Sequence, residues 1–379
     1  MKVLPIEHLT YNTGPRGSLR LRCAAASFLN EEFHPREMVT AANMFITPGL
    51  ASAIDALSWA ICNEGEGIMV PQPFYNGFLV DTLNRSNARL VGVTYDGVEG
   101  YKDLDDLFCP AVNRKAIEAA FRKAQEEGIT PPETLKGFAS FCGKEGLHFI
   151  SDEIYAKSLF PNPAIPNPTP FISALALDLD NVIDPTFVHV LYGASKDFCA
   201  NGLRLGFVCT KNEGVVGAMS SIGIFSWSPH VIQDVWAAML EDKQWMRSFM
   251  LKKSKLMAEN YDIARTFFRN RGIGYYEMNA GLYLWVDLRH LLIPKETLEE
   301  SGYSALRVNS PEAGIYKQRE MKVAEICMKN GVMIAPGNVY MPEELGWFRI
   351  TFSLGKEALE EGLKRLEKSL VEAKAEIQG

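Results

Sequence analysis

Apolar residues along the chain form short runs of strand length that alternate with longer stretches of helical periodicity. The strand-like runs end in turn or polar residues, as in IMVPQPFY, ARLVGVTY, LHFISDEIY, FVHVLYGAS and LRLGFVCT. Helical stretches such as RGSLRLRCAAASFLNEEF and NRKAIEAAFRKAQEEG lie between or beside them. This alternation predicts an α/β fold with a mainly parallel, doubly wound sheet, whose functional residues lie where strands end in loops.

The last third of the chain follows a different pattern. It opens with a long helix, has strands at GLYLWVDL and WFRITFS, and finishes with a charged helix. This pattern predicts a smaller α+β domain. With 379 residues the chain is long enough for two cores. We therefore expect a large domain over residues 15–240 and a small domain made of residues 1–14 and 241–379.

One segment interrupts the alternation of strands and helices. The helix that ends near Gly128 is followed only by Ile129 and Thr130 before a second helix starts at Pro131-Pro132. A parallel sheet needs a strand between two such helices. Either the fold has an αα-hairpin at this point, or residues are missing from this chain.

Composition narrows the classes of function. The formal net charge is -7 and no block of Lys and Arg occurs, which argues against nucleic acid or an anionic membrane as partner. Seven cysteines are scattered singly without CxxC pairs, so we expect reduced thiols in an intracellular protein and no metal site. No stretch reaches the roughly 18 apolar residues of a membrane helix. The expected protein is soluble and cytoplasmic.

Two strand ends carry the strongest candidate chemistry. In GASKDFCANGLRLG, Lys196 follows an apolar strand among small residues, and Arg204 lies where a loop can return it to the same place. In SDEIY, Asp152 ends another apolar strand and can pair with a buried cation, within reach of Tyr155. Ordinary structure also accounts for each motif alone: a surface lysine beside a capping serine, Ser195, or an N-cap aspartate with a core tyrosine.

Three weaker signals lie elsewhere. The strand-to-helix turn in TPGLASAIDAL, residues 47–57, can hold a phosphate on free backbone N–H groups, although an ordinary turn has the same sequence. Tyr75 in PQPFYNGF can present its ring to a flat ligand, although aromatic residues after strands usually enter the core. Arg349 interrupts the apolar strand GWFRITFS, and its planar fork fits a carboxylate.

Seven segments in this order resemble the fold-type I pyridoxal-phosphate enzymes of the class I/II aminotransferase superfamily. They are YNTGPRGSLRLRCAAASFL, PGLASAIDAL, PQPFYNGF, SDEIYAKSLF, SKDFCANGLRLG, NAGLYLWVDL and GWFRITFS, which span nearly the whole chain. The most similar subgroup is the 1-aminocyclopropane-1-carboxylate synthase-like proteins, fungal ones in particular. The resemblance implies pyridoxal 5′-phosphate as cofactor and an α-amino acid as substrate.

The resemblance also implies catalytic roles for individual residues. Lys196 matches the lysine that holds the cofactor covalently and moves the Cα proton, Asp152 the acid paired with the pyridine nitrogen, and Tyr155 the phenol that donates to O3′. Arg349 matches the arginine that binds the substrate α-carboxylate. Tyr11 matches a tyrosine that reaches the neighbouring subunit's cofactor, which implies a homodimer with shared active sites.

A second set of residues matches positions that bind the cofactor. Leu50 and Ala51 occupy the positions whose backbone amides meet the phosphate, and Arg204 matches the arginine that binds it. Ser195 precedes the lysine within the same binding loop. Tyr75 matches the aromatic residue that stacks on the pyridine ring.

The chain also departs from the family pattern. The Asn-Pro-x-Asn-Pro-x-Gly segment that usually precedes the stretch beginning PPETLKG is absent, at the place where the alternation failed. Gly193 stands where a phosphate-binding serine is common, and Ala51 stands where a threonine is common. The leading expectation is an enzyme that transaminates an amino acid or eliminates at Cβ or Cγ. The alternatives are a catalytically impaired dimeric scaffold and a C-S lyase acting on cysteine conjugates.

Overall fold

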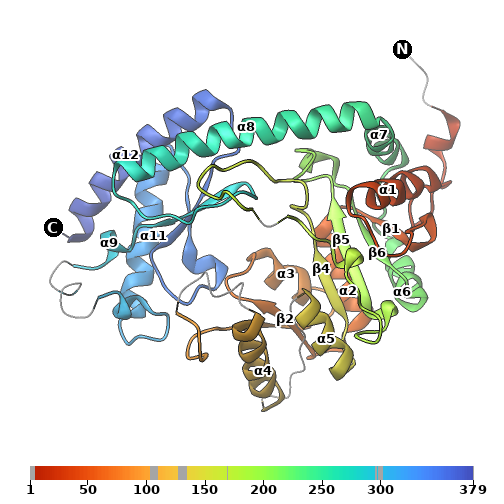
Figure 1. Cartoon of the computed structure of the whole chain (residues 1–379), viewed down its shortest axis with the longest axis horizontal. Coiled ribbons are helices and arrows are strands. Elements are labelled where there is room, and N and C mark those ends of the chain that lie inside the picture. The colour runs from red at the N-terminus through yellow and green to blue at the C-terminus, as the bar shows by residue number, and fades with distance from the viewer. Residues whose placement is uncertain are drawn as a thin grey trace. The chain divides into compact units, whose positions relative to one another are not determined.

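The computed structural model describes residues 5–102, 110–126, 135–168, 170–294, 297 and 302–378 (Figure 1). They form two compact units. The first unit consists of Met1–Pro71, Gly77–Lys157 and Pro170–Met250, and the second of Gln72–Asn76, Ser158–Thr169 and Leu251–Gly379. The sequence analysis expected the N-terminal residues in the smaller domain. In the structure they belong to the first unit. The reason is a contact in that unit, between His8 Nε2 and Asp234 Oδ2 at 2.9 Å.

The described residues of the first unit form six strands and the helices that connect them. Its strands are β1 (Met44–Thr47), β2 (Gly67–Pro71), β3 (Arg89–Val93), β4 (Phe149–Asp152), β5 (Val188–Gly193) and β6 (Gly206–Thr210). Its α-helices are α1 (Leu19–Glu32), α2 (Leu50–Ile61), α3 (Gly77–Leu83), α4 (Pro110–Glu126), α5 (Leu135–Glu145), α6 (Glu213–Gly223) and α7 (His230–Glu241). Its 3-10 helices are η1 (Ile6–Leu9), η2 (Ala41–Asn43), η4 (Ala174–Ala176), η5 (Pro185–Phe187) and η6 (Asn201–Leu203).

The strands of this unit pair in two sheets. One has the order β1-β6-β5-β4, and the other pairs β2 with β3. The β4–β5 and β2–β3 pairs are parallel, as expected, whereas β6 runs antiparallel to both β1 and β5. The connection from β5 to β6 explains this direction, because it contains only turns and the short η6 and no crossover helix.

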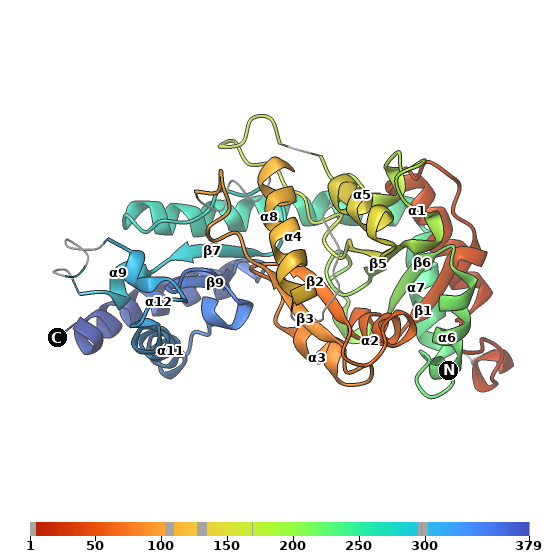
Figure 2. The same cartoon turned by 90° about the horizontal axis from the view of Figure 1, so that it is seen from below.

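Helices cover both faces of the four-stranded sheet (Figure 2). Side chains alternate between the faces along each strand. Tyr192 and Phe207 pack in one core with residues of α1 and α7. Their sequence neighbours Leu191 and Val208 pack on the other face with residues of α2 and α6. The doubly covered α/β arrangement expected from the sequence is therefore present.

The two sheets of the first unit end at a shared cavity. Between β3 and β4 the described chain passes through α4 and α5 without forming a strand. The interruption noted at Gly128 and Pro131-Pro132 lies outside the described residues. A cavity of about 530 Å³ is lined by all five residues of β2, by residues of β4, and by α2, α3 and α5. Within the described residues, no strand joins the two sheets, and this cavity lies between β2 and β4.

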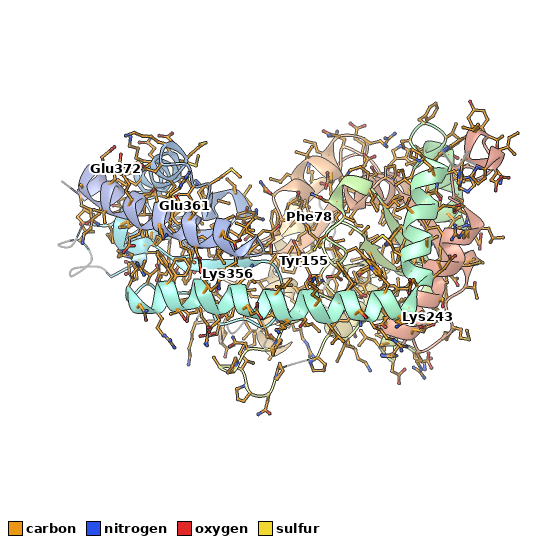
Figure 3. All side chains as sticks on the ribbon, turned by 90° about the horizontal axis from the view of Figure 1, so that it is seen from above. Phe78, Tyr155, Lys243, Lys356, Glu361 and Glu372 are labelled. Atoms are coloured by element: carbon orange, nitrogen blue, oxygen red, sulfur yellow. The ribbon has the colours of Figure 1, made fainter. Side chains whose placement is uncertain are left out.

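The second unit has one antiparallel sheet of order β7-β9-β8. Its elements are α8 (Lys243–Asn270), which begins in the first unit, β7 (Tyr283–Asp287), α9 (Arg289–Leu292), η7 (Ser304–Leu306), α11 (Ala313–Lys329), β8 (Ala335–Pro336), η8 (Gly337–Tyr340), β9 (Trp347–Thr351) and α12 (Lys356–Gln378). Leu284 and Phe348 of the sheet share a buried core with Leu366 of α12. Figure 3 shows the charged residues Lys356 and Glu361 along the same helix.

The helices of the described residues differ in length and in apolar character. None of them combines enough length with enough apolar character to span a bilayer.

Candidate active site

Three of the candidate residues meet at one edge of the four-stranded sheet. Asp152 is the last residue of β4, Tyr155 follows it, and Lys196 follows β5. Because β4 and β5 are parallel neighbours, their carboxyl ends lie side by side. The Lys196 Nζ atom lies 5.9 Å from the centroid of the Tyr155 ring. The positive charge of Lys196 is also close enough to lower the pKa of Asp152. Figure 3 labels Tyr155 within this unit.

The Asp152 carboxyl is in an unusual electrostatic environment. The Asp152 side chain is exposed at the end of β4, where it lines the cavity, although the protein around it is dense enough to make its charged form less favourable. Burial raises the pKa of Asp152 to about 6, and the neighbouring charge of Glu153 adds to this. The Ile154 N–H, which donates to Asp152 Oδ1 at 3.2 Å, and the charge of Lys196 act in the opposite direction. With this pKa the carboxyl is already mostly ionised at neutral pH, and a cationic partner beside it would keep it ionised at lower pH as well.

The loops that carry these residues are joined by a buried carboxylate that the sequence analysis missed. Asp197 is fully buried. Its Oδ2 accepts the Lys157 N–H from the loop after β4 at 2.7 Å and the Tyr192 hydroxyl from β5 at 2.9 Å. The only signal in the sequence is an acid directly after Lys196, which looks like any surface charge. In the fold this acid fixes the Lys196 loop against the Asp152 loop.

The start of α2, where the sequence predicts a phosphate site, has backbone N–H groups without a side-chain cap. Its N-cap, Gly49, has φ of +89° and offers no side-chain acceptor, so the first backbone N–H groups of the helix, at Leu50 and Ala51, are not capped by a side chain. Arg204 lies against this turn, since a Cβ on Gly49 would come 2.7 Å from Arg204 Nη2. Arg204 Nη1 donates to the Asn201 carbonyl at 3.1 Å. The guanidinium and the amides of the helix therefore lie next to each other.

Close packing explains why residue 193 is a glycine. A Cβ added to Gly193 would lie 2.6 Å from Leu50 Cδ1 and 3.0 Å from the Leu205 carbonyl oxygen. A Cβ on the paired Gly206 would meet the same Leu50 methyl at 2.6 Å. Leu50 therefore fills the space that a serine side chain at 193 would enter.

The remaining candidates of the first unit lie in three places. Ser195 is half-buried in the turn just before Lys196, and Ala51 is exposed on the first turn of α2. Tyr11 follows η1 and is 86% exposed, with its ring 5.9 Å from that of Trp227. Its exposure leaves the ring open to a partner molecule.

The second unit holds the other two candidates, Tyr75 and Arg349. The Arg349 guanidinium lies over the Tyr283 ring, with Cζ 4.1 Å from its centroid, and 4.9 Å from the Tyr340 centroid. Within the described residues its Nε atom is buried and has no hydrogen-bond partner. Burial raises the pKa of Tyr340, an effect that the charge of Arg349 opposes. Tyr75 is 54% exposed. Arg349 is thus oriented by two aromatic rings while one of its donors stays unused.

Comparisons with known proteins agree in sequence and in fold. Residues 8–366 match the family of class I and II aminotransferases. 1-Aminocyclopropane-1-carboxylate synthase 1 of Oryza sativa subsp. indica is 30% identical over 365 residues, covering 90% of this chain and 68% of that protein. "Probable aminotransferase aclI" of Aspergillus oryzae is 28% identical over 373 residues, covering 95% and 83%.

Solved structures share the fold at low sequence identity. A Thermus thermophilus aspartate aminotransferase mutant superposes with a TM-score of 0.68 at 20% identity, covering 94% of this chain and 87% of that one. A Pyrococcus structure titled protein-A1 gives a TM-score of 0.72 at 19% identity, with 97% and 87% covered. The resemblance inferred from the seven segments is confirmed. The chain belongs to the class I and II aminotransferases, has the fold of fold-type I enzymes, and shares their cofactor, pyridoxal 5′-phosphate.

Proposed function

We propose that the protein is a pyridoxal-phosphate enzyme that acts on an α-amino acid, by transamination or by elimination at Cβ or Cγ. The observation that carries this proposal is the cluster of Lys196, Asp152 and Tyr155 at one sheet edge, in the unit that also holds the uncapped start of α2 beside Arg204. Relatives named as synthases and as aminotransferases support both reaction types.

The residues present fit this cofactor. A dianionic phosphate needs backbone amides and a guanidinium, which the α2 N-terminus and Arg204 supply. The Gly49 turn leaves room for close approach, because a Cβ there would collide with Arg204. A protonated pyridine nitrogen needs an anion, and Asp152 is a carboxyl whose pKa, raised to about 6, falls when a cation pairs with it. When bound, the cofactor withdraws electrons from a bond to the substrate Cα.

Three residues of the chain would then perform the acid–base and anchoring work. Lys196 would hold the cofactor covalently and, once released, move the proton at the substrate Cα. Asp152 would keep the ring nitrogen protonated. Tyr155 would donate its hydroxyl proton to the cofactor oxygen. Asp197 would act through the others, as a positioning residue that keeps the two loops in register.

Substrate binding is proposed for Arg349. The stacked guanidinium has a free buried Nε, and a bidentate α-carboxylate would satisfy it. Tyr75 is proposed to stack on the cofactor ring, for which its exposed side chain is suited. Which Cα bond is broken depends on how the substrate is held, so the arginine contributes to the choice of reaction.

We further propose a homodimer. Ile6, Leu9 and Tyr11 of the N-terminal segment are 75% or more exposed, as is Phe225 in the loop that also holds Trp227, the ring partner of Tyr11. Exposed apolar residues in such a group are typical of interfaces. Sedimentation at micromolar concentration should give the mass of two chains. A monomer that still binds cofactor would contradict the shared active site.

The decisive experiment locates the cofactor. Pyridoxal phosphate is added to the purified protein, the complex is reduced with borohydride, and the peptides are mapped. The pyridoxyl group is expected on Lys196, and an exposed lysine such as Lys211 serves as control. A panel of amino acids and cysteine conjugates then distinguishes the reactions. Transamination yields a 2-oxo acid and proceeds only when an amino-group acceptor is present. Release of pyruvate and a thiol without an acceptor identifies a C-S lyase.

One observation favours the alternative of an impaired homologue that serves as a binding scaffold. Asp152 lines the cavity beside β4, and no strand among the described residues joins its sheet to the β2–β3 pair. Protein that takes up no cofactor, or takes it up without turning over any amino acid, would support this alternative.

A further inference from the structure

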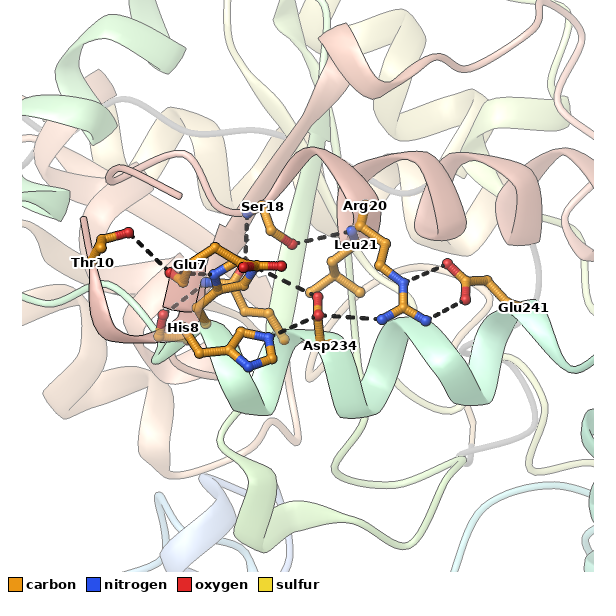
Figure 4. A network of polar contacts seen from close by, with 11 residues as sticks. Glu7, His8, Thr10, Ser18, Arg20, Leu21, Asp234 and Glu241 are labelled. Atoms are coloured by element: carbon orange, nitrogen blue, oxygen red, sulfur yellow. Dashed lines mark hydrogen bonds and ion pairs between the residues drawn. The ribbon is translucent and has the colours of Figure 1, made fainter. Parts of the chain in front are cut away.

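Outside the candidate active site, three side chains of the types that bind metals converge in the first unit. Figure 4 shows two of them, His8 and Asp234, in contact. His8 lies on η1, and His230 and Asp234 lie on α7. One ligand atom from each residue can be chosen so that all three lie within 4.8 Å of one another. The sequence analysis expected no metal site because the cysteines form no CxxC pairs. It could not find this cluster, because His8 and Asp234 are 226 positions apart and no short motif links them.

The hydrogen bonds of His230 leave a lone pair aimed at a carboxylate. Its Nδ1 lies 3.2 Å from the Glu7 carbonyl oxygen, which can only accept, so Nδ1 carries a proton. In the neutral ring Nε2 is then an acceptor. This atom lies 3.6 Å from Asp234 Oδ1, which is buried and accepts no hydrogen bond within the described residues. Two acceptors thus face each other, an arrangement that a cation between them would stabilise.

His8 presents a second unsatisfied nitrogen. Its side chain is only 8% exposed, and that of His230 only 10%. His8 Nε2 lies 2.9 Å from Asp234 Oδ2, while Nδ1 is buried without a partner in the described residues. A buried polar atom left unpaired costs free energy, so a cluster with two such atoms needs an explanation.

We propose that His8, His230 and Asp234 bind a divalent transition-metal ion of the zinc class. Two imidazoles and a carboxylate, with water in a fourth position, form a common set of ligands for Zn²⁺. The surrounding contacts are those of metal ligands in general, which are held by outer hydrogen bonds. The Glu7 carbonyl fixes His230, and Arg20 Nη1 lies 3.2 Å from Asp234 Oδ2, which leaves Oδ1 for the metal.

The nearby positive charges select the kind of metal. Arg20 and the N-terminus of α7 both oppose a cation, although Glu241 pairs with Arg20 at 2.6 Å and offsets part of its charge. The site therefore suits a metal that bonds strongly to imidazole, and not Mg²⁺ or Ca²⁺, which prefer oxygen ligands.

The metal would fasten the N-terminal segment to the body of the first unit. It would link η1 to α7 at His8, three residues before the exposed Tyr11. The site is independent of the proposed catalytic chemistry, because none of its ligands belongs to the loops that carry Lys196 or Asp152.

The test uses the full-length protein without a histidine tag, stripped with a chelator and then titrated with Zn²⁺ alone. We expect one Zn²⁺ per chain, and at least about tenfold weaker binding in His8→Ala and in His230→Ala. His34→Asn is the matched control, because His34 is exposed, lies outside the cluster and has φ of 49°, which asparagine tolerates. It should bind like the wild type. Co²⁺ in place of Zn²⁺ should give the visible bands of a tetrahedral site.

A second measurement keeps the proposal testable if a variant folds poorly. Zn²⁺ should raise the Tm of the wild type and of His34→Asn, and Mg²⁺ should not. His230→Gln keeps a polar side chain of similar length and should lose the Zn²⁺ response while it still unfolds cooperatively. The proposal is overturned if the wild type binds no Zn²⁺, or if the cluster variants bind it as tightly as the wild type. A Tm that depends on pH through these three residues but does not change with Zn²⁺ would mean that the cluster holds a proton. This result would also contradict the proposal.

Discussion

The two sheets of the first unit differ in how completely they are packed. In the four-stranded sheet, all five residues of β6 and all but the first of β5 are buried. In the two-stranded sheet only Met69 of β2 and Val93 of β3 are buried, and all of β2 lines the cavity. Lys196 follows the well-packed β5, while Asp152 ends β4, the strand that borders the cavity. The proposed covalent anchor is thus on a complete scaffold and the proposed ring partner is at its edge.

The largest expected effect tests Lys196, the proposed anchor that follows the well-packed strand β5. Lys196→Ala should lower turnover of any amino-acid substrate by at least about a thousandfold, because it removes both the anchor and the proton-transfer group. Steady-state kinetics on cofactor-loaded protein measure this. Lys211→Ala, on an exposed lysine paired with Glu37, should leave turnover unchanged. Retained turnover in Lys196→Ala would remove this residue from the mechanism.

A matched pair of core substitutions compares the two sheets directly. Phe207→Ala in β6 removes a fully buried ring stacked 5.7 Å from Trp236 and should lower the free energy of unfolding by about 3–5 kcal/mol. Met69→Ala in β2 enlarges a cavity that already exists and should lower it by about 2 kcal/mol or less. Urea unfolding curves give both values. Equal costs would mean that β2 is packed as well as β6.

An inserted strand tests whether the segment between β3 and β4 limits cofactor binding. A strand and an Asn-Pro-x-Asn-Pro-x-Gly loop inserted after Thr130 should tighten cofactor binding by about tenfold to a hundredfold, the value of one charge-assisted hydrogen bond. Titration of apo-protein with cofactor measures the change. A Gly/Ser insert of equal length is the control and should have no such effect. Nanomolar affinity in the protein without any insert would show that another residue already supplies the donor.

The smallest effect concerns the pH dependence at the edge strand. The pKa of Asp152 is raised from 3.8 to about 6, so the cofactor-free protein holds this proton more tightly than the unfolded chain does. The contribution of Asp152 to stability therefore falls as pH rises from about 4 to about 6. Cofactor affinity should rise over the upper part of that window, by about tenfold per pH unit at most, since the ionised form is needed.

Asp152→Asn is the control for this pH dependence. It should weaken cofactor binding and make it nearly independent of pH between about 5 and 7. Fluorescence titrations at a series of pH values give the profile. A variant with the same slope as the wild type would assign the titration to another group.

Candidate residues that lie within a single sequence motif could be predicted from the sequence. Lys196, Asp152 and the turn before Leu50 were placed at strand ends because apolar runs stop there, and the fold brings the first two together. The antiparallel direction of β6 was not predicted, because an apolar run has no direction and only the short loop after β5 determines it.

Contacts between distant segments could not be predicted. Asp197 is next to Lys196 in sequence, but its role depends on Lys157 from another loop. The approach of His8 to Asp234 depends on how η1 lies on α7. Such contacts follow from the packing of whole helices and loops against one another. The spacing of residues within one segment of sequence does not show this packing.

The close packing around Leu50 has a consequence for how this site can change by mutation. A serine at position 193 would collide with the Leu50 methyl group while that leucine keeps its present position. A smaller residue at 50 would first have to open the space, at the cost of a small void between Gly193 and Gly206. The two positions are therefore coupled: a serine at 193 requires the Leu50 side chain to move, and a smaller residue at 50 removes that requirement. The Leu205 carbonyl oxygen, 3.0 Å from the added Cβ, stays in place in either background, so the space gained at 50 is only part of what a side chain at 193 needs.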